Sequence, residues 1–195
     1  MDPINVLVLI NLLVSMSANW GGARKGFKTS ITKVTERPQT YLQKVPLNVS
    51  AAVLVLIILA VFNLGVLSED IKNSFPNVRL VGLSMFVIFS WIQVLSYRAL
   101  GKSYAQDIVI LKEHELQTNG PYRIIRHPQY LSQILSDLGA GLALFSYLVV
   151  PGVVIFEAPL LIMRAVLEDK MLSKHFKDEF KVYKSKSGFI FPFIG

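Results

Sequence analysis

The chain contains no cysteine among its 195 residues. That absence excludes disulfide bonds, thiolate metal sites and cysteine nucleophiles, and it leaves the redox compartment undetermined. A Gly-x-Gly-x-x-Gly turn is also missing, so the common glycine-rich cofactor loop between a strand and a helix is not predicted. No metal site is predicted either. Any cofactor must therefore bind to loops and helix ends.

Charged residues are scarce and unevenly placed. They make up 17% of the chain against 52% hydrophobic residues, and the mean hydropathy of +0.48 exceeds that of ordinary soluble domains. The net charge is +7, but Lys and Arg flank apolar runs and form no continuous stripe with interleaved aromatics. The composition therefore predicts the lipid bilayer as a partner and no nucleic acid.

Five apolar runs are long enough, or nearly so, to cross a hydrocarbon core of roughly 30 Å. They are residues 4–18, 47–67, 78–97, 129–148 and 149–167. The first is short, and a cleaved signal peptide is the rival interpretation, but Asp2 precedes it and its basic residues follow it. The last two are separated only by Pro151-Gly152, which predicts a tight turn there.

These runs predict an all-α integral membrane protein with about five transmembrane helices. Residues 1–195 would form a single domain, with three helices in residues 1–97 and the cofactor-binding half in residues 98–195. Residues 20–46, whose glycines and prolines predict a loop, carry one acidic residue, Glu36, against six basic ones: Arg24, Lys25, Lys28, Lys33, Arg37 and Lys44. The positive-inside rule places that segment in the cytoplasm and the N-terminus outside.

Two further segments are predicted to be cytoplasmic. Residues 98–128 are polar, with a short strand-like run at 108–111. The tail after Glu168 returns to the cytoplasm as an amphipathic helix over residues 168–183, with Met171, Leu172, Phe176, Phe180 and Tyr183 on one face and Lys174, Lys177 and Lys181 on the other. Two interpretations of this helix stay open: it lies on the membrane surface, or it covers a cytoplasmic active site.

Residues 114–130 contain the densest group of polar residues with recognisable motif spacing. It begins with His114-x-Leu116, continues with Gly120-x-Tyr122-Arg123, and ends with Arg126-His127-Pro128-x-Tyr130 at a predicted helix start. Pro128 is suited to the first turn of a helix, whose free N–H groups can face a ligand. A second group follows in order: Arg164, then Glu168-Asp169 one turn later, then a terminal Pro192-Phe193-Ile194.

These motifs resemble those of the isoprenylcysteine carboxyl methyltransferase family and of related phospholipid methyltransferase-like membrane proteins. The resemblance covers residue 101 to the C-terminus. It departs from the family at Asp169, where a second Glu is usual. The resemblance implies an S-adenosylmethionine-dependent methyltransferase with a cytoplasmic cofactor-binding loop and a lipophilic or prenylated acceptor.

The same resemblance implies roles for individual residues. The cofactor would be lined by His114, Glu115, Leu116, Gln117, Tyr122, His127, Pro128, Gln129 and Tyr130, and Glu168 would bind its ammonium group. Arg164 would be the catalytic residue and would contact the acceptor. By residue type alone, His127 and Tyr130 could be interfacial residues, His114 a solvated loop residue, and Arg164 with Glu168 a structural ion pair.

Two acidic residues, Asp137 and Glu157, fall near the middle of predicted membrane helices. An ionised carboxylate there costs at least a few kcal/mol, so we predict that both line the acceptor pocket. Helical spacing places Asp137 on one stripe with Tyr130 and Gln133, and Glu157 on another with Leu161, Arg164 and Glu168. The alternative is that these groups are neutral and hydrogen-bonded between helices.

The acceptor itself is left open by the sequence. Carboxyl O-methylation of an isoprenylcysteine-like substrate is favoured, because a carboxylate needs no base and only a positioning cation. A phospholipid amine or small thiol is the alternative within the same architecture. A sterol reductase that uses NADPH, and a membrane scaffold or small transporter without catalytic activity, are alternatives of other classes.

Overall fold

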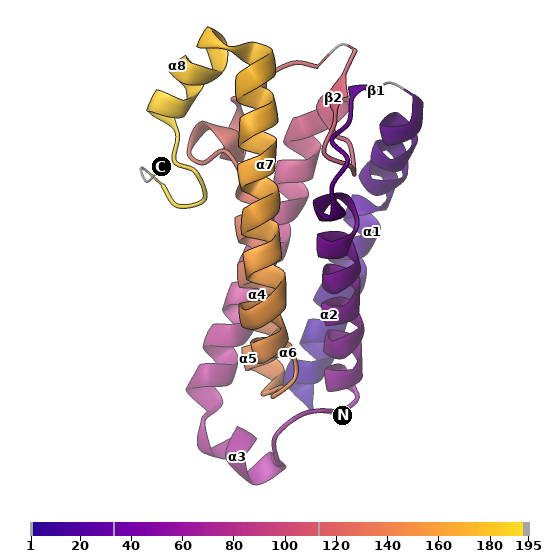
Figure 1. Cartoon of the computed structure of the whole chain (residues 1–195). Coiled ribbons are helices and arrows are strands. Elements are labelled where there is room, and N and C mark those ends of the chain that lie inside the picture. Colours follow the sequence, from indigo (N-terminus) through magenta and orange to yellow (C-terminus); the bar gives the residue numbers. More distant parts are fainter. Residues whose placement is uncertain (1, 33, 113, 193–195) are drawn as a thin grey trace.

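The computed structural model describes residues 2–32, 34–112 and 114–192, and it is mostly helical (Figure 1). Phe193 and Ile194 of the terminal motif lie outside the described residues. The helices are α1 (Pro3–Thr32), α2 (Val45–Val61), α3 (Glu69–Ser74), α4 (Pro76–Leu100), α5 (Pro128–Leu144), α6 (Val149–Gly152), α7 (Ala158–Phe176) and α8 (Asp178–Lys186). A π-helical segment, η4 (Val153–Glu157), joins α6 to α7.

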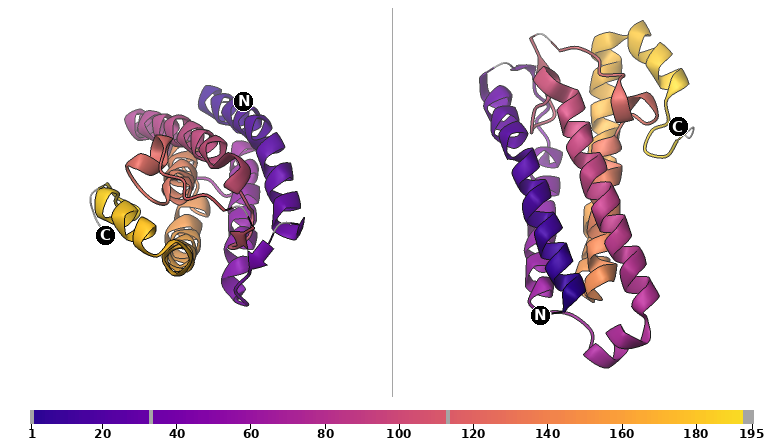
Figure 2. Two further views of the ribbon diagram at one scale, coloured as in Figure 1. Left: turned by 90° about the horizontal axis from the view of Figure 1, so that it is seen from above. Right: turned by 180° about the vertical axis from the view of Figure 1, so that it is seen from behind.

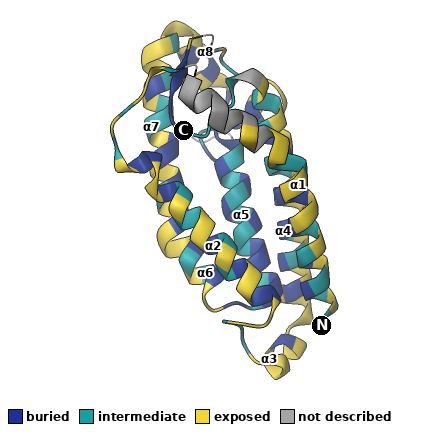
Figure 3. Ribbon diagram, turned by 90° about the vertical axis from the view of Figure 1, so that its right-hand side faces the viewer, coloured by how far each residue is buried: buried dark blue, intermediate teal, exposed yellow. Residues whose placement is uncertain are grey.

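Four helical segments are long and apolar enough to cross a membrane. They are Pro3–Gly21, Tyr41–Val61, Pro76–Leu100 and Val149–Phe176, and they coincide with four of the five predicted runs. The remaining run corresponds to α5, which has 17 residues. Large apolar side chains such as Leu7, Ile88 and Ile155 are at least half exposed, and Figure 3 shows exposed residues on the outer faces of the helices. The multi-pass membrane architecture is confirmed at this level.

Helices α4 and α5 approach each other so closely at two positions that only glycine fits there. A Cβ atom on Gly82 would lie 2.5 Å from the backbone nitrogen of Ala143, and one on Gly139 would lie 2.5 Å from that of Phe86. Small residues at such crossings let helices in a membrane pack backbone to backbone. This contact fixes α5, whose first residue is Pro128, against α4.

The turn between α5 and α6 is not where the sequence predicts it. Helix α5 ends at Leu144, and its C-cap Phe145 adopts a left-handed conformation with φ 52°. Ser146 Oγ then accepts the N–H groups of Leu148 and Val149, so the helix restarts at Val149. The predicted break at Pro151-Gly152 is wrong because Pro151 lies in the first turn of α6, where its missing N–H has no intrahelical partner.

The first helix is also longer than predicted. Residues 4–18 are helical as expected, but α1 continues to Thr32 through part of the segment that was predicted to be a loop. No proline occurs between Pro3 and Pro38, so nothing in this stretch forces the helix to stop. The chain then forms β1 (Val34–Glu36), which pairs antiparallel with β2 (Ile110–Leu111) inside the predicted strand-like run.

The C-terminal segment is two helices and not one. Lys177, with φ 48°, ends α7 and starts α8, which buries Phe180 and Tyr183. Figure 2 shows α8 at the edge of the bundle, on the side away from α1. Helix α3 lies at one end of the molecule, while α8 and the two strands lie at the other (Figure 1). The candidate site occupies this second end.

Candidate active site

A cavity lies where the loop after α4, the start of α5 and the outer part of α7 meet. Of the ten residues that the sequence assigns to the cofactor, eight line it: His114, Glu115, Leu116, Gln117, Tyr122, His127, Gln129 and Glu168. The other two, Pro128 and Tyr130, are buried but do not line it. The structure therefore brings together residues from two motifs that lie about forty positions apart in the sequence.

Other lining residues were not assigned to the cofactor from the sequence. They are Leu100, Ser103, Ala105, Asp107, Ile108, Val109, Ile110, Arg126, Met171, Leu172 and Tyr183. Tyr183 reaches the site from α8 and donates a hydrogen bond to the carbonyl of Tyr122 at 2.7 Å. The strand-like pattern at 108–111 was the only signal available for the wall that β2 forms.

The Glu168 carboxylate is held by three groups while it lines the cavity. The Tyr130 hydroxyl donates a hydrogen bond to Oε1. Arg164 Nε lies 3.7 Å from the same oxygen, and His127 Nδ1 lies 3.6 Å from Oε2. Because its side chain is only 19% exposed, this anion is fixed in position and presented to the cavity without rotating freely.

His127 lies between two carboxylates of α7. Its Nε2 is 2.7 Å from Asp169 Oδ1, and Asp169 Oδ2 accepts a hydrogen bond from Arg126 Nε at 3.0 Å. Burial by itself lowers the pKa of His127, but the hydrogen bonds to Asp169 and Glu168 outweigh it and raise the pKa above its usual value. The shorter acid at position 169, which departs from the family pattern, thus contacts both members of the Arg-His pair.

Arg164 is buried behind the cavity and does not line it. Its Nη1 donates to the carbonyls of Leu42 and Gln43 at 3.2 and 3.1 Å, and its Nη2 donates to that of Gln106 at 2.6 Å. Its Nε donates to the Tyr130 hydroxyl at 2.9 Å. These contacts join α7 to the segment before α2, to the loop after α4 and to α5. The assignment of Arg164 to the acceptor stays a prediction.

The loop that carries the first motif is pinned to the end of α4. Gln117 Nε2 donates to the carbonyl of Ala99 at 2.6 Å, and Ser103 Oγ donates to that of Glu115 at 3.3 Å. His114 accepts the N–H of Leu111 at 3.3 Å, and its ring lies edge-on against Phe176. Burial, with a smaller contribution from His175, lowers the pKa of His114. A neutral imidazole in this position can accept a hydrogen bond.

A chain of polar side chains crosses the middle of the bundle away from the cavity. Gln93 donates to Gln133 at 3.2 Å, and Gln133 donates to Glu157 Oε1 at 3.1 Å. Asp137 lies beside Glu157. Glu157 is fully buried at the end of the π-helix η4, just before Pro159, and its Oε2 has no hydrogen-bond partner among the residues that the structure describes. Neither acid lines the cavity, so their assignment to the acceptor stays a prediction.

Comparison with known proteins identifies the family. A sequence model described as phospholipid methyltransferase matches residues 78–179, which is more than half of the chain. The chain belongs to the phospholipid methyltransferase family. The matched residues run from α4 into α8 and include every residue that lines the cavity except Tyr183. The membership confirms the resemblance drawn from the motifs and supports a membrane methyltransferase.

The individual proteins that match the chain are distant relatives. The chain is 30% identical over 118 residues to "Uncharacterized protein YpbQ" of Bacillus subtilis (strain 168), covering 58% of this chain and 69% of that protein. It is 30% identical over 119 residues to a "Probable protein-S-isoprenylcysteine O-methyltransferase" from Oryza sativa subsp. indica and to another from subsp. japonica. Those matches cover 60% of this chain and 62% of each rice protein, less than two thirds of their length.

Proposed function

We propose that this protein is an S-adenosylmethionine-dependent methyltransferase that methylates the carboxylate of a lipophilic, isoprenylcysteine-like acceptor at the membrane. The observation that carries the proposal is the Glu168 carboxylate, which is fixed by Tyr130 and His127 in the wall of a cavity formed by the family's two motifs. The names of the two rice relatives support the choice of acceptor.

The residues present suit this cofactor. A fixed carboxylate can accept a charge-assisted hydrogen bond from an ammonium group, and such bonds are about twice as strong as neutral ones. Glu168 supplies that carboxylate, and the loop from His114 to Gln117, which Gln117 ties to the end of α4, lines the same cavity. S-adenosylmethionine, when bound, supplies an electrophilic methyl group that is transferred by in-line displacement.

The protein's contribution to this transfer is chiefly orientation, which can be worth roughly 7–11 kcal/mol. A guanidinium has five N–H donors, and Arg164 makes four hydrogen bonds to the described residues. We propose that the remaining donor contacts the acceptor carboxylate while the other four hold Arg164 beside Tyr130. An acceptor carboxylate is ionised at neutral pH, so no general base is required.

A second acceptor class, an amine, is favoured by one observation. Glu157 is fully buried beside Asp137, and one of its oxygens has no partner within the described part of the chain. A carboxylate pair in this position suits a cationic head group better than an anionic one, and an amine acceptor must also lose a proton before it attacks. The description of the family as phospholipid methyltransferase agrees with this alternative.

We also propose five transmembrane spans, with α5 as the fifth. Helix α5 packs along α4 and runs from the cavity end of the bundle back towards the end where α4 began. The chain then passes through α6 and η4 into α7, which leads to the cavity end again. The N-terminus would lie outside, and the cavity and C-terminus would lie in the cytoplasm, where the water-soluble cofactor is available. The acceptor would enter sideways from the bilayer.

The proposal is tested by methyl transfer from radiolabelled S-adenosylmethionine to three acceptors, with the full chain in lipid nanodiscs. The acceptors are a farnesylcysteine analogue, phosphatidylethanolamine and a small thiol. Transfer to the farnesylcysteine carboxyl supports the proposal, and transfer to phosphatidylethanolamine alone would favour the amine alternative. Absence of cofactor binding would overturn both and would point to a reductase or to a scaffold.

A further inference from the structure

A second cavity lies between α7 and α8, next to the first. Glu168 lines the first cavity, and its neighbour Asp169 lines the second. We call the second cavity the α7–α8 groove. Besides Asp169, it is lined by Val166, Lys170, Ser173 and Lys174 of α7, by Phe180 and Lys184 of α8, by Phe189 after α8, and by Arg126, which lines the first cavity as well. Arg126 thus belongs to both cavities, whereas Val166, Lys170, Ser173, Phe180, Lys184 and Phe189 do not line the first.

The walls of the α7–α8 groove are of two kinds. Val166, Phe180 and Phe189 are apolar, whereas Lys170 and Lys184 are cationic. Val166 lies one turn of α7 deeper in the apolar span than Lys170, and it is 39% exposed. The groove therefore has an apolar side towards the hydrocarbon and a cationic side towards the cytoplasmic end of the bundle. That polarity matches a phospholipid, which places its phosphate above its acyl chains.

The two lysines have no competing anion. Neither Lys170 nor Lys184 has an ion-pair partner among residues 2–32, 34–112 and 114–192. By contrast, Lys174, which also lines the groove, is paired with Glu36 at 2.8 Å. The carboxylate in the groove, Asp169, already accepts a hydrogen bond from Arg126 and contacts His127. An anion that enters the groove thus meets two ammonium groups and no unpaired acid.

We propose that the α7–α8 groove binds an anionic glycerophospholipid of the surrounding leaflet, with its phosphate between Lys170 and Lys184 and an acyl chain along Val166 and Phe189. A free phosphate would use the lysines but would gain nothing from the three apolar side chains. A zwitterionic lipid would bring its own cation close to the same lysines. The site is independent of methyl transfer, because binding of this lipid requires neither cofactor nor acceptor.

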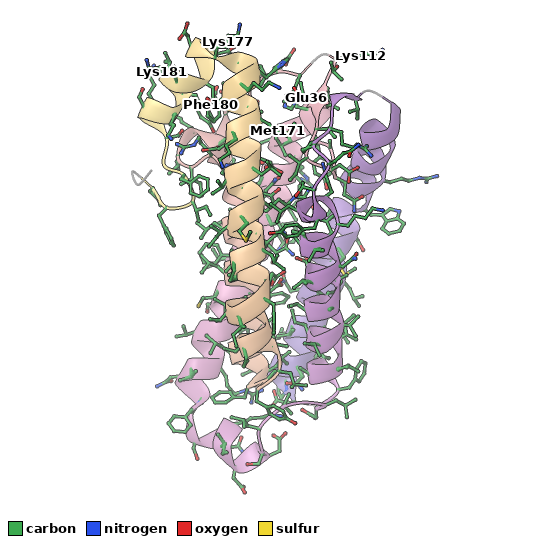
Figure 4. All side chains as sticks on the ribbon, viewed as in Figure 1. Glu36, Lys112, Met171, Lys177, Phe180 and Lys181 are labelled. Atoms are coloured by element: carbon green, nitrogen blue, oxygen red, sulfur yellow. The ribbon has the colours of Figure 1, made fainter. Side chains whose placement is uncertain are left out.

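The chain offers a matched pair of lysines for a control. Lys177 and Lys181 are exposed, do not line the groove, and lie at the outer edge of α8, whereas Phe180 lies on the side of α8 that faces α7 (Figure 4). The double variant Lys170→Gln/Lys184→Gln and the control Lys177→Gln/Lys181→Gln remove the same charge from neighbouring positions. All four side chains are exposed, so both variants should fold, and thermal unfolding checks this directly.

The test is native mass spectrometry of the full chain in detergent, titrated with dioleoyl phosphatidylglycerol or dioleoyl phosphatidylcholine. We expect preference for phosphatidylglycerol, an affinity loss of about 30-fold in the Lys170/Lys184 variant, and a change of about twofold or less in the control. Equal losses in the two variants, or equal affinity for the two lipids, would overturn the proposal. Displacement of phosphatidylglycerol by millimolar inorganic phosphate would show a free-anion site and would overturn the lipid assignment.

Discussion

His127 Nε2 lies 2.7 Å from the Oδ1 atom of Asp169, although the two residues are 42 positions apart. The same imidazole lies 3.6 Å from Glu168 through Nδ1, so one histidine at the start of α5 is held by two consecutive acids of α7. The contact connects the family's two motifs and fixes the carboxylate that we assign to the cofactor. Three of the predictions below concern residues in or next to this network.

Protonation of His127 should make stability depend on pH. The pKa of His127 is raised above its usual value of 6.5 in the folded state, so its stabilising charge is fully present below that value. The contribution is lost as pH rises through the raised pKa. We expect the unfolding temperature to fall over this interval, and His127→Gln to reduce the fall. The exposed His175→Gln serves as the control, and an unchanged pH profile in His127→Gln would contradict the charged state.

The topology can be tested with reporter fusions at the two ends of the bundle. Asn73 lies in α3 at one end, and Lys112 lies beside the strands at the other (Figures 1 and 4). The basic excess in residues 20–46 predicts an external reporter after Asn73 and a cytoplasmic one after Lys112. The opposite result would place the cavity on the non-cytoplasmic side of the membrane, away from the cytoplasmic supply of S-adenosylmethionine.

Arg164 should matter for both folding and transfer. Replacing it with Ala removes the donor to the carbonyls of Leu42 and Gln43, and each group left unsatisfied costs about 1–3 kcal/mol. We expect Arg164→Ala to lower the unfolding temperature and to abolish methyl transfer. Arg164→Lys should restore little activity, because the lysine ammonium lacks the planar guanidinium group that can bind a carboxylate with two hydrogen bonds.

The kinetics of Arg164→Lys separate the two roles. Contact with the acceptor predicts a raised KM for the acceptor and a nearly unchanged affinity for S-adenosylmethionine. If the variant loses only thermal stability, with both parameters as in the parent protein, Arg164 is purely structural and its assignment to the acceptor is wrong.

Asp137 and Glu157 are expected to set acceptor preference. Asp137→Asn and Glu157→Gln keep the size of each side chain and remove its charge, so the contact of Gln133 with position 157 can persist. We expect each variant to shift the ratio of transfer to carboxylate and amine acceptors by about tenfold while S-adenosylmethionine affinity is spared. Unchanged ratios, with only the unfolding temperature altered, would support a structural role between the helices.

Much of the fold follows from local pattern. The apolar run at 78–97 predicts α4 to within three residues, because helices that meet lipid need long uninterrupted hydrophobic segments. The run at 47–67 predicts the start of α2 to within two residues but extends six residues past its end at Val61. The position of the turn after α5 was predicted wrongly, because Pro151 is a strong turn signal in the sequence. In the structure Pro151 lies in the first turn of α6, where a proline does not disrupt the helix. The left-handed Phe145 has no comparable signal, because its conformation is set by the packing around it.

The candidate site was predictable on one side only. His114, His127 and Glu168 meet as the motifs suggested, because each motif is short and continuous in the sequence. The part of the wall formed by Asp107 to Ile110, like Tyr183 of α8, comes from segments that reach the cavity only through tertiary contacts. No spacing in the sequence shows that Asp169 pairs with His127, since His127 immediately precedes α5 and Asp169 lies on α7.

The central claim is that Glu168 binds the ammonium group of S-adenosylmethionine, and isothermal titration of the cofactor into purified variants tests it most directly. Loss of a charge-assisted hydrogen bond of roughly 1.5–3 kcal/mol predicts that Glu168→Gln weakens binding by about ten- to a hundredfold. The matched control, Glu179→Gln, removes an exposed acid of α8 and should bind like the parent protein. Equal affinities in the two variants, or no binding by the parent protein, would contradict the account.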